Sequence, residues 1–210
     1  MQQNFNDNQL WEDFKGDKKD ALSQIYQSYV DQLFRYGKKF STNNDLIKDT
    51  IQDLFFDLIR TRLTLGPTNN IHFYLTKAFR RRLAKNMNSS TNETELKNET
   101  ELQANYIVYS SEDEWIQKES LSKKEEWIRQ GLAGLSPKQR EILYYRFSCD
   151  FDYDQICEIM SMKYDSARKM VFRAIQSLRQ HFSDTNLSLL IIFLRNKNIF
   201  EKSDFLSPQK

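Results

Sequence analysis

Four basic side chains near the C-terminal end of the chain could bind nucleic acid. They recur at helical spacing after the tripeptide Ser161–Lys163, opposite the apolar side of a predicted helix. The basic set is Arg168, Lys169, Arg173 and Arg179, and the apolar set is Ala167, Val171, Ala174, Ile175, Leu178 and Phe182. Such a helix suits the major groove of duplex DNA and its flanking phosphates. The alternative is an ordinary three-helix bundle with a solvated basic face, since charged helix faces are common.

Two shorter predicted helices precede this one and would hold it in place. Ser136 is an N-cap, Pro137 takes the first helical position, and Gln139 completes a capping box. Asp152 and Gln155 repeat the capping pattern at the next helix. The apolar faces comprise Ile142, Leu143 and Phe147 in the first helix and Ile156, Ile159 and Met160 in the second. A tight turn between the last two helices predicts a helix-turn-helix.

The N-terminal half contains three further amphipathic segments. One runs from Ala21 to Phe40, and another follows the N-cap candidates Asn43 and Asn44. After a loop from 66 to 70, a third is expected over 71–87. Their apolar positions are Leu22, Ile25, Tyr26, Tyr29, Val30, Leu33 and Phe34 in the first, Leu46, Ile47, Ile51, Leu54, Phe55, Leu58 and Ile59 in the second, and Phe73, Leu75, Ala78, Phe79 and Leu83 in the third.

Charge is segregated between the second and third of these segments. The second has an acidic side with Asp49, Gln52, Asp53 and Asp57, and the third has a basic side with Lys77, Arg80, Arg81, Arg82 and Lys85. The two groups cancel in the net charge of +2, and we expect them to meet different partners. Near-neutral total charge would be unusual for a protein that simply coats DNA.

Composition agrees with an all-α fold of two small helical domains joined by a polar linker. The 210 residues include 5 Gly and 3 Pro, and 39% are hydrophobic, which suits helical bundles with short connections. Cys149 and Cys157 form no recognisable metal spacing with the histidines, and we expect Cys157 to be a buried free thiol. No phosphate loop or nucleophile–base pair is visible, so we predict neither enzymatic activity nor a cofactor.

Other features of the sequence bear on the cellular location of the protein and on the roles of its linker and tail. Without a signal sequence or a long apolar run, the chain is expected to be cytoplasmic and to lack a membrane span. The polar stretch 88–122 is either a functional tether or a merely solvated linker. The apolar run 187–194 is expected to pack on the C-terminal domain, with a protein partner or a membrane surface as the alternative.

The C-terminal pattern resembles a known DNA-binding region. The strings LSPKQREILYYRF, DYDQICEIM and SARKMVFRAIQSLRQ are similar to the C-terminal region of bacterial sigma factors of the sigma-70 family, especially the extracytoplasmic-function type. The matching positions are Leu135, Pro137, Arg140, Glu141, Tyr153, Asp154, Ile156, Cys157, Ala167, Arg168, Arg173 and Ala174. Ser161 replaces the usual Gly of the turn, and Lys163 replaces the usual Ser cap of the recognition helix.

The N-terminal half resembles the same family. IYQSYVDQLFRYGKKF and KDTIQDLFFDLIR are similar to the first helices of the core-binding region, with Asp49, Gln52, Asp53 and Phe55 at matching positions. FYLTKAFRRRLAKN is similar to the helix that holds the opened minus-ten strand. Tyr74 stands where the family generally has Trp, and Arg81 replaces a frequent Asn.

The resemblance implies an alternative sigma factor whose partners are core RNA polymerase and promoter DNA, with an anti-sigma protein as a further candidate. The implied parts are a core-binding and minus-ten domain (1–87), a linker (88–122), a minus-thirty-five domain (123–183) and a tail (184–210). The implied contacts with polymerase are Asp49, Gln52 and Asp53. By the same resemblance, the minus-ten strand is captured by the loop 64–70 and by Tyr74, Lys77, Arg80 and Arg81, and the minus-thirty-five element is contacted by Ser166, Arg168, Lys169, Phe172 and Arg173.

Two other interpretations stay open from the sequence. A helix-turn-helix regulator could bind promoters without polymerase, although it would not need the acidic helix. An anti-sigma-like adaptor could keep the fold without its DNA contacts. No small-molecule substrate is expected under any of the three.

Overall fold

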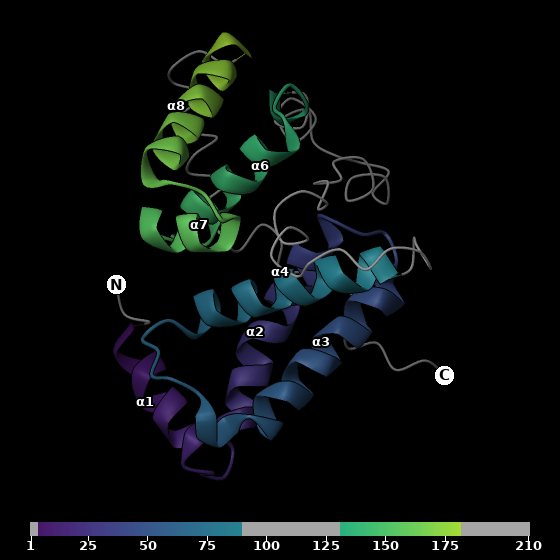
Figure 1. Ribbon diagram of the computed structural model, residues 1–210, viewed down its shortest axis with the longest axis vertical. Helices are drawn as coiled ribbons and strands as arrows, with labels where there is room; N and C mark the ends of the chain where they lie inside the picture. The colour runs from purple at the N-terminus through teal and green to yellow at the C-terminus, as the bar shows by residue number, and fades with distance from the viewer. Residues whose placement is uncertain (1–3, 90–130, 182–210) are drawn as a thin grey trace. The chain divides into compact units, whose positions relative to one another are not determined.

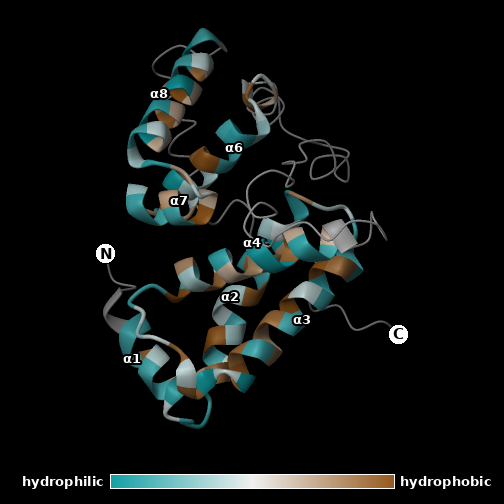
Figure 2. Cartoon of the chain, viewed as in Figure 1, coloured by the Kyte–Doolittle hydropathy of each residue, from teal (hydrophilic) through white to brown (hydrophobic). Residues whose placement is uncertain are grey.

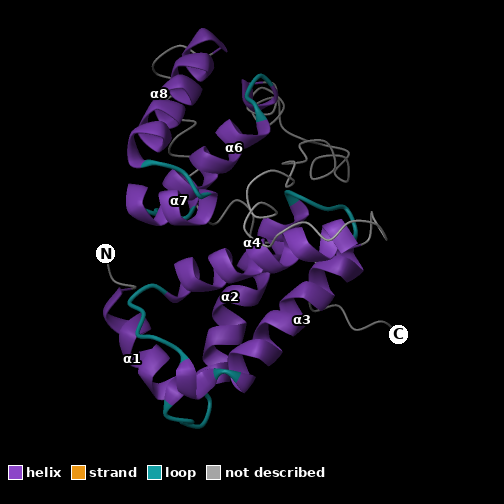
Figure 3. Cartoon of the chain, viewed as in Figure 1, coloured by secondary structure: helices purple, strands orange, loops and turns teal. Residues whose placement is uncertain are grey.

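The computed structural model describes residues 4–89 and 131–181, and every regular element within these ranges is helical (Figures 1 and 3). The predicted all-α fold is therefore confirmed. The chain divides into two compact units, Met1–Ile107 and Val108–Lys210. Most of the predicted linker and the apolar run 187–194 lie outside the described residues.

The N-terminal unit contains four α-helices and a short 3-10 helix among its described residues. These are α1 (Asn4–Lys15), α2 (Ala21–Lys38), α3 (Asn44–Arg60), η1 (Arg62–Thr64) and α4 (Ile71–Ser89). Helices α2, α3 and α4 pack against one another, and polar and apolar residues alternate around each of them (Figure 2). Asn43 caps α3 as expected, because its side-chain oxygen accepts from the backbone N–H groups of Asp45 and Leu46.

Close packing in this unit requires Gly37. A Cβ at this position would lie 2.7 Å from Ile47 Cγ2 and 3.2 Å from Phe79 Cζ. Both neighbours are fully buried and belong to α3 and α4. The glycine therefore lets α2 approach the other two helices at a distance that no larger residue would permit.

The sequence patterns above did not identify α1. Trp11 is completely buried and Phe14 is 3% exposed, so this helix contributes two large side chains to the core. It packs against α2, η1 and α4.

The described part of the C-terminal unit has the expected helix-turn-helix. Its elements are α6 (Pro137–Leu143), a π-helical turn η2 (Tyr144–Ser148), α7 (Tyr153–Met160) and α8 (Tyr164–His181). Both predicted capping boxes are present, with Ser136 and Gln139 at α6 and Asp152 and Gln155 at α7. Helix α8 packs on α6 and α7.

Burial follows the predicted apolar faces closely. The buried members are Ile142, Leu143, Ile156, Ile159, Met160, Ala167, Val171, Ala174 and Leu178. Phe147 and Ile175 are only partly buried, and the predicted core residue Phe182 lies outside the described residues. The apolar side of α8 is thus fixed against the unit, which leaves its opposite side exposed.

Candidate nucleic-acid interface

The turn between α7 and α8 contains a serine in the left-handed backbone conformation. Ser161 ends α7 in the left-handed conformation, with φ 51° and ψ 51°. The backbone N–H of Met162 donates to the carbonyl of Cys157 at 3.1 Å, which closes the end of α7. A non-glycine residue in this region costs about 1–2 kcal/mol. Ser161 therefore adopts, at an energetic cost, a conformation that glycine adopts freely.

Aromatic contacts hold the start of α8. The Lys163 side chain, at the N-cap position of this helix, offers no hydrogen-bond acceptor. The Lys163 carbonyl accepts from Ala167 N–H at 3.0 Å, but an ammonium group cannot cap the free N–H groups of the first turn. The ring of Tyr164 lies 5.5 Å from the ring of Tyr153 on α7. Arg146 in turn lies 5.3 Å over the Tyr153 ring and donates to the carbonyl of Phe151 at 3.0 Å. Arg146, Tyr153 and Tyr164 thus form a row of side-chain contacts that links η2, α7 and α8.

A buried carboxylate stabilises α6, the helix against which α8 packs. Glu141 on α6 is only 2% exposed and accepts a hydrogen bond from the Tyr145 hydroxyl at 2.7 Å. Arg140 donates to the carbonyl of Leu135 at 2.7 Å, at the residue before the Ser136 cap. These two hydrogen bonds help to fix the helix that α8 packs against.

All five residues predicted to contact the minus-thirty-five element lie on the exposed side of α8. They are Ser166, Arg168, Lys169, Phe172 and Arg173. Phe172 is 58% exposed and places an apolar surface among the cations. None of the three cations is ion-paired with another described residue. This face can therefore offer charge to phosphates, hydrogen-bond donors to bases and an apolar ring to a thymine methyl group.

Residues 125–178 match the family model described as Sigma-70, region 4. The matched segment covers about a quarter of the chain and includes α6, η2, α7 and most of α8. The finding identifies this segment as similar to the DNA-binding helix-turn-helix of sigma-70 region 4. Sigma-70 region 4 is a DNA-binding domain and not a catalytic one. No curated protein matches the chain in a comparison of whole sequences.

The four residues expected to contact the minus-ten strand lie along one side of α4. Lys77 and Arg81 are exposed, while Arg80 and Tyr74 are partly buried. The Tyr74 ring lies 4.9 Å from the ring of Trp11 on α1. Burial raises the pKa of Tyr74, and the charge of Arg81 acts in the opposite direction. The phenol is therefore neutral at physiological pH and available for stacking and hydrogen bonding.

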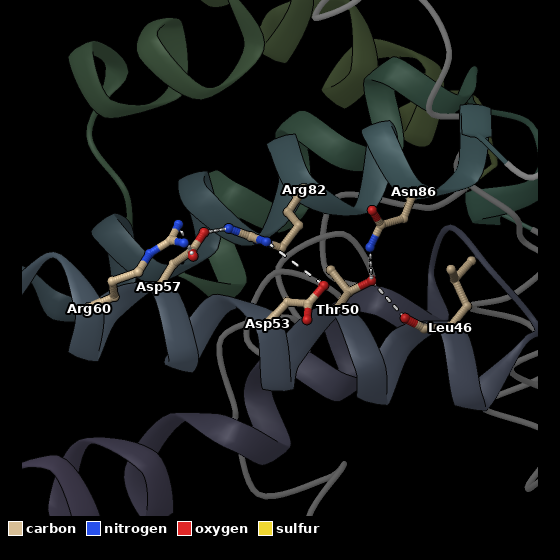
Figure 4. A network of polar contacts seen from close by, with 7 residues as sticks. All are labelled: Leu46, Thr50, Asp53, Asp57, Arg60, Arg82 and Asn86. Carbon is tan, nitrogen blue, oxygen red and sulfur yellow. Dashed lines mark hydrogen bonds and ion pairs between the residues drawn. The ribbon is translucent and has the colours of Figure 1, made fainter.

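The acidic side of α3 is partly neutralised by α4, which differs from the sequence expectation. Arg82 forms an ion pair with Asp57, and its guanidinium lies 3.8 Å from the Asp53 carboxylate (Figure 4). Arg60 also pairs with Asp57, at 2.8 Å. The expectation that the acidic and basic groups meet different partners is thus wrong for Asp57 and Arg82. Asp49, Gln52 and Asp53, the predicted polymerase contacts, remain exposed.

A second polar contact joins the same two helices. Asn86 on α4 donates to the Thr50 hydroxyl at 3.0 Å, and this hydroxyl donates to the Leu46 carbonyl at 2.6 Å (Figure 4). Thr50 is completely buried. Because these contacts fix α3 and α4 to each other, the proposed polymerase face and the proposed minus-ten face form parts of one rigid unit.

Cys157 is less buried than expected. Both cysteines are free thiols, but Cys149 is buried and Cys157 is only partly buried.

Within residues 4–89 and 131–181 no cluster of acidic, His and Cys side chains could hold a metal. None of the helices described is both long and apolar enough to cross a bilayer.

Proposed function

We propose that this protein is an alternative sigma factor that binds core RNA polymerase and directs promoter-specific initiation. The observation that carries the proposal is the exposed cationic side of α8, which lies within the segment that matches sigma-70 region 4. A helix-turn-helix presents such a side to the major groove. In this role Ser166, Arg168, Lys169, Phe172 and Arg173 contact the minus-thirty-five element.

The N-terminal unit supplies the other two contacts of the proposed mechanism. The exposed Asp49, Gln52 and Asp53 dock on polymerase. Tyr74 stacks on a base of the opened minus-ten strand, and Lys77, Arg80 and Arg81 bind its phosphates. The support is the exposure of the acidic residues and the arrangement of these four side chains along one side of α4. Such a factor acts in the bacterial cytoplasm, where an anti-sigma protein is a further candidate partner.

Reconstitution with purified core polymerase tests the proposal. We expect the full chain to co-elute with core enzyme in gel filtration. We also expect it to produce defined transcripts from a library of promoter fragments that core enzyme alone does not transcribe. Binding to promoter duplexes without co-elution or transcription would instead favour a helix-turn-helix regulator that acts without polymerase.

A further inference from the structure

Helix α1 contacts the segment between α3 and α4 at three separate places. Asp17, just after α1, pairs with Arg62 of η1. The Trp11 indole N–H donates to the Gly66 carbonyl at 2.9 Å. The Asp7 carboxylate accepts from the backbone N–H of Ile71 at 3.0 Å. Residues 7–17 therefore hold the beginning, the middle and the end of the segment 62–71, which we call the α3–α4 loop.

Asp7 acts as a cap for a helix that begins far away in the sequence. Its side chain also accepts a hydrogen bond from the Tyr29 hydroxyl at 3.1 Å, and the residue is only 8% exposed. Asn70 caps the same helix conventionally, since its side chain accepts from Phe73 N–H at 2.8 Å. A carboxylate at a helix N-terminus also interacts favourably with the helix dipole. The first turn of α4 is thus fixed by two side chains, one of which comes from α1.

Trp11 links the α3–α4 loop to the proposed base-stacking residue. The indole is completely buried, while the ring that it contacts, Tyr74, is partly exposed. The Trp11 side chain therefore contacts the Tyr74 ring and also donates a hydrogen bond to the Gly66 carbonyl. Gly66 itself is exposed, and no atom within 4 Å would contact a Cβ there. At Gly66 the loop is therefore held through its carbonyl and has open space where a side chain would lie.

We propose that α1 is a positioning element for capture of the opened promoter strand, with Asp7 and Trp11 as its positioning residues. The inference rests on the proposed function. By holding the α3–α4 loop and Tyr74 in place before DNA arrives, α1 removes the entropy cost of ordering them on binding. Neither residue touches the strand.

The test uses the complete protein with core polymerase and a fluorescent single strand from the minus-ten region of a promoter that the holoenzyme transcribes. Trp11→Phe keeps a ring beside Tyr74 but removes the N–H donor to Gly66. Asp7→Ala removes the acceptor for Ile71, and Asp7→Asn restores an oxygen there. We expect Trp11→Phe and Asp7→Ala each to weaken strand binding by about three- to tenfold, as for the loss of one hydrogen bond. Asp7→Asn should recover most of the loss.

Controls separate positioning from a general loss of stability. Ile25→Val changes a fully buried residue of α2 and leaves the three contacts of α1 intact. It should bind the strand like the wild type, and all variants should keep wild-type affinity for a minus-thirty-five duplex.

The outcomes distinguish this inference from the proposed function. If the wild-type holoenzyme binds no minus-ten strand, the proposed function fails and the role of α1 fails with it. If the wild type binds and Trp11→Phe and Asp7→Ala bind equally well, only the role of α1 is refuted. Equal weakening by Ile25→Val would also refute it, because a general loss of stability would then explain the effect.

Discussion

Replacing Arg168 by alanine separates base reading from phosphate binding on α8. Arg168 is exposed and makes no hydrogen bond or ion pair with another residue in the described ranges. Its removal therefore breaks no internal contact, and alanine has the higher helix propensity. The free energy of unfolding should change by less than about 0.5 kcal/mol, as for other surface substitutions. Any larger effect on DNA binding then belongs to the interface.

The expected loss follows from the placement of Arg168 near the start of the exposed side, beside the buried Ala167. A side chain that bonds to base edges contributes about 1–3 kcal/mol of discrimination, which corresponds to about 5- to 150-fold in Kd. We therefore expect Arg168→Ala to weaken binding to the preferred element within this range. It should also remove the preference at one base pair and leave the preferences elsewhere intact.

Fluorescence anisotropy on the minus-thirty-five duplex and its single-base variants, at two salt concentrations, measures both effects. A phosphate contact behaves differently, because its loss weakens all sequences equally and flattens the salt dependence. Arg173→Ala, further along α8, provides the comparison, and either pattern is compatible with its position. If Arg168→Ala keeps the wild-type ranking of variants with a shallower salt dependence, our placement of Arg168 at the base edges is wrong.

Three further predictions concern the polymerase face, a helix cap and a thiol. Asp53→Lys should weaken binding to core polymerase in a pull-down while binding to a minus-thirty-five duplex stays unchanged. Asp49→Lys, at an exposed carboxylate on the same side of α3, should have the same effect, and unchanged core affinity in both would refute the docking assignment. Ser136→Ala should lower the free energy of unfolding of the C-terminal unit by about 1 kcal/mol through loss of the cap, measured by urea denaturation, and an unchanged midpoint would contradict this. Burial and the charges of two neighbouring aspartates raise the pKa of the Cys157 thiol, so its alkylation should require higher pH than that of an ordinary thiol. Asp154→Asn should shift the alkylation profile to lower pH, and an unshifted profile would exclude the electrostatic contribution.

Local signals in the sequence predicted the C-terminal unit well. The caps at Ser136 and Asp152 depend on side chains three residues apart, and such patterns are visible in the sequence. The exposed side of α8 likewise follows from helical periodicity. The left-handed Ser161 could not be read from its residue type, because serine rarely adopts this conformation.

Contacts between distant segments were not predictable in the same way. The pairing of Asp57 with Arg82 depends on how α3 and α4 pack, and charge periodicity on each helix alone cannot reveal it. The role of Asp7 depends on a partner 64 residues away. The one available signal for α1 was the spacing of Trp11 and Phe14, which lie three residues apart on the same side of a helix.

The hydrogen bond from Ile71 to Asp7 also constrains the order in which the N-terminal unit folds. Helix α1 leaves the ribosome before α4 has been synthesised, so its carboxylate has no amide to accept from at that stage. Contacts between α2 and α3 close shorter loops and form at lower entropy cost. We therefore expect the contacts of α1 with the α3–α4 loop and with Ile71 to form late, after α4 has joined the other helices. The amide of Ile71 then becomes a natural reporter in hydrogen exchange, because its protection measures the docking of α1 apart from the folding of the rest of the unit.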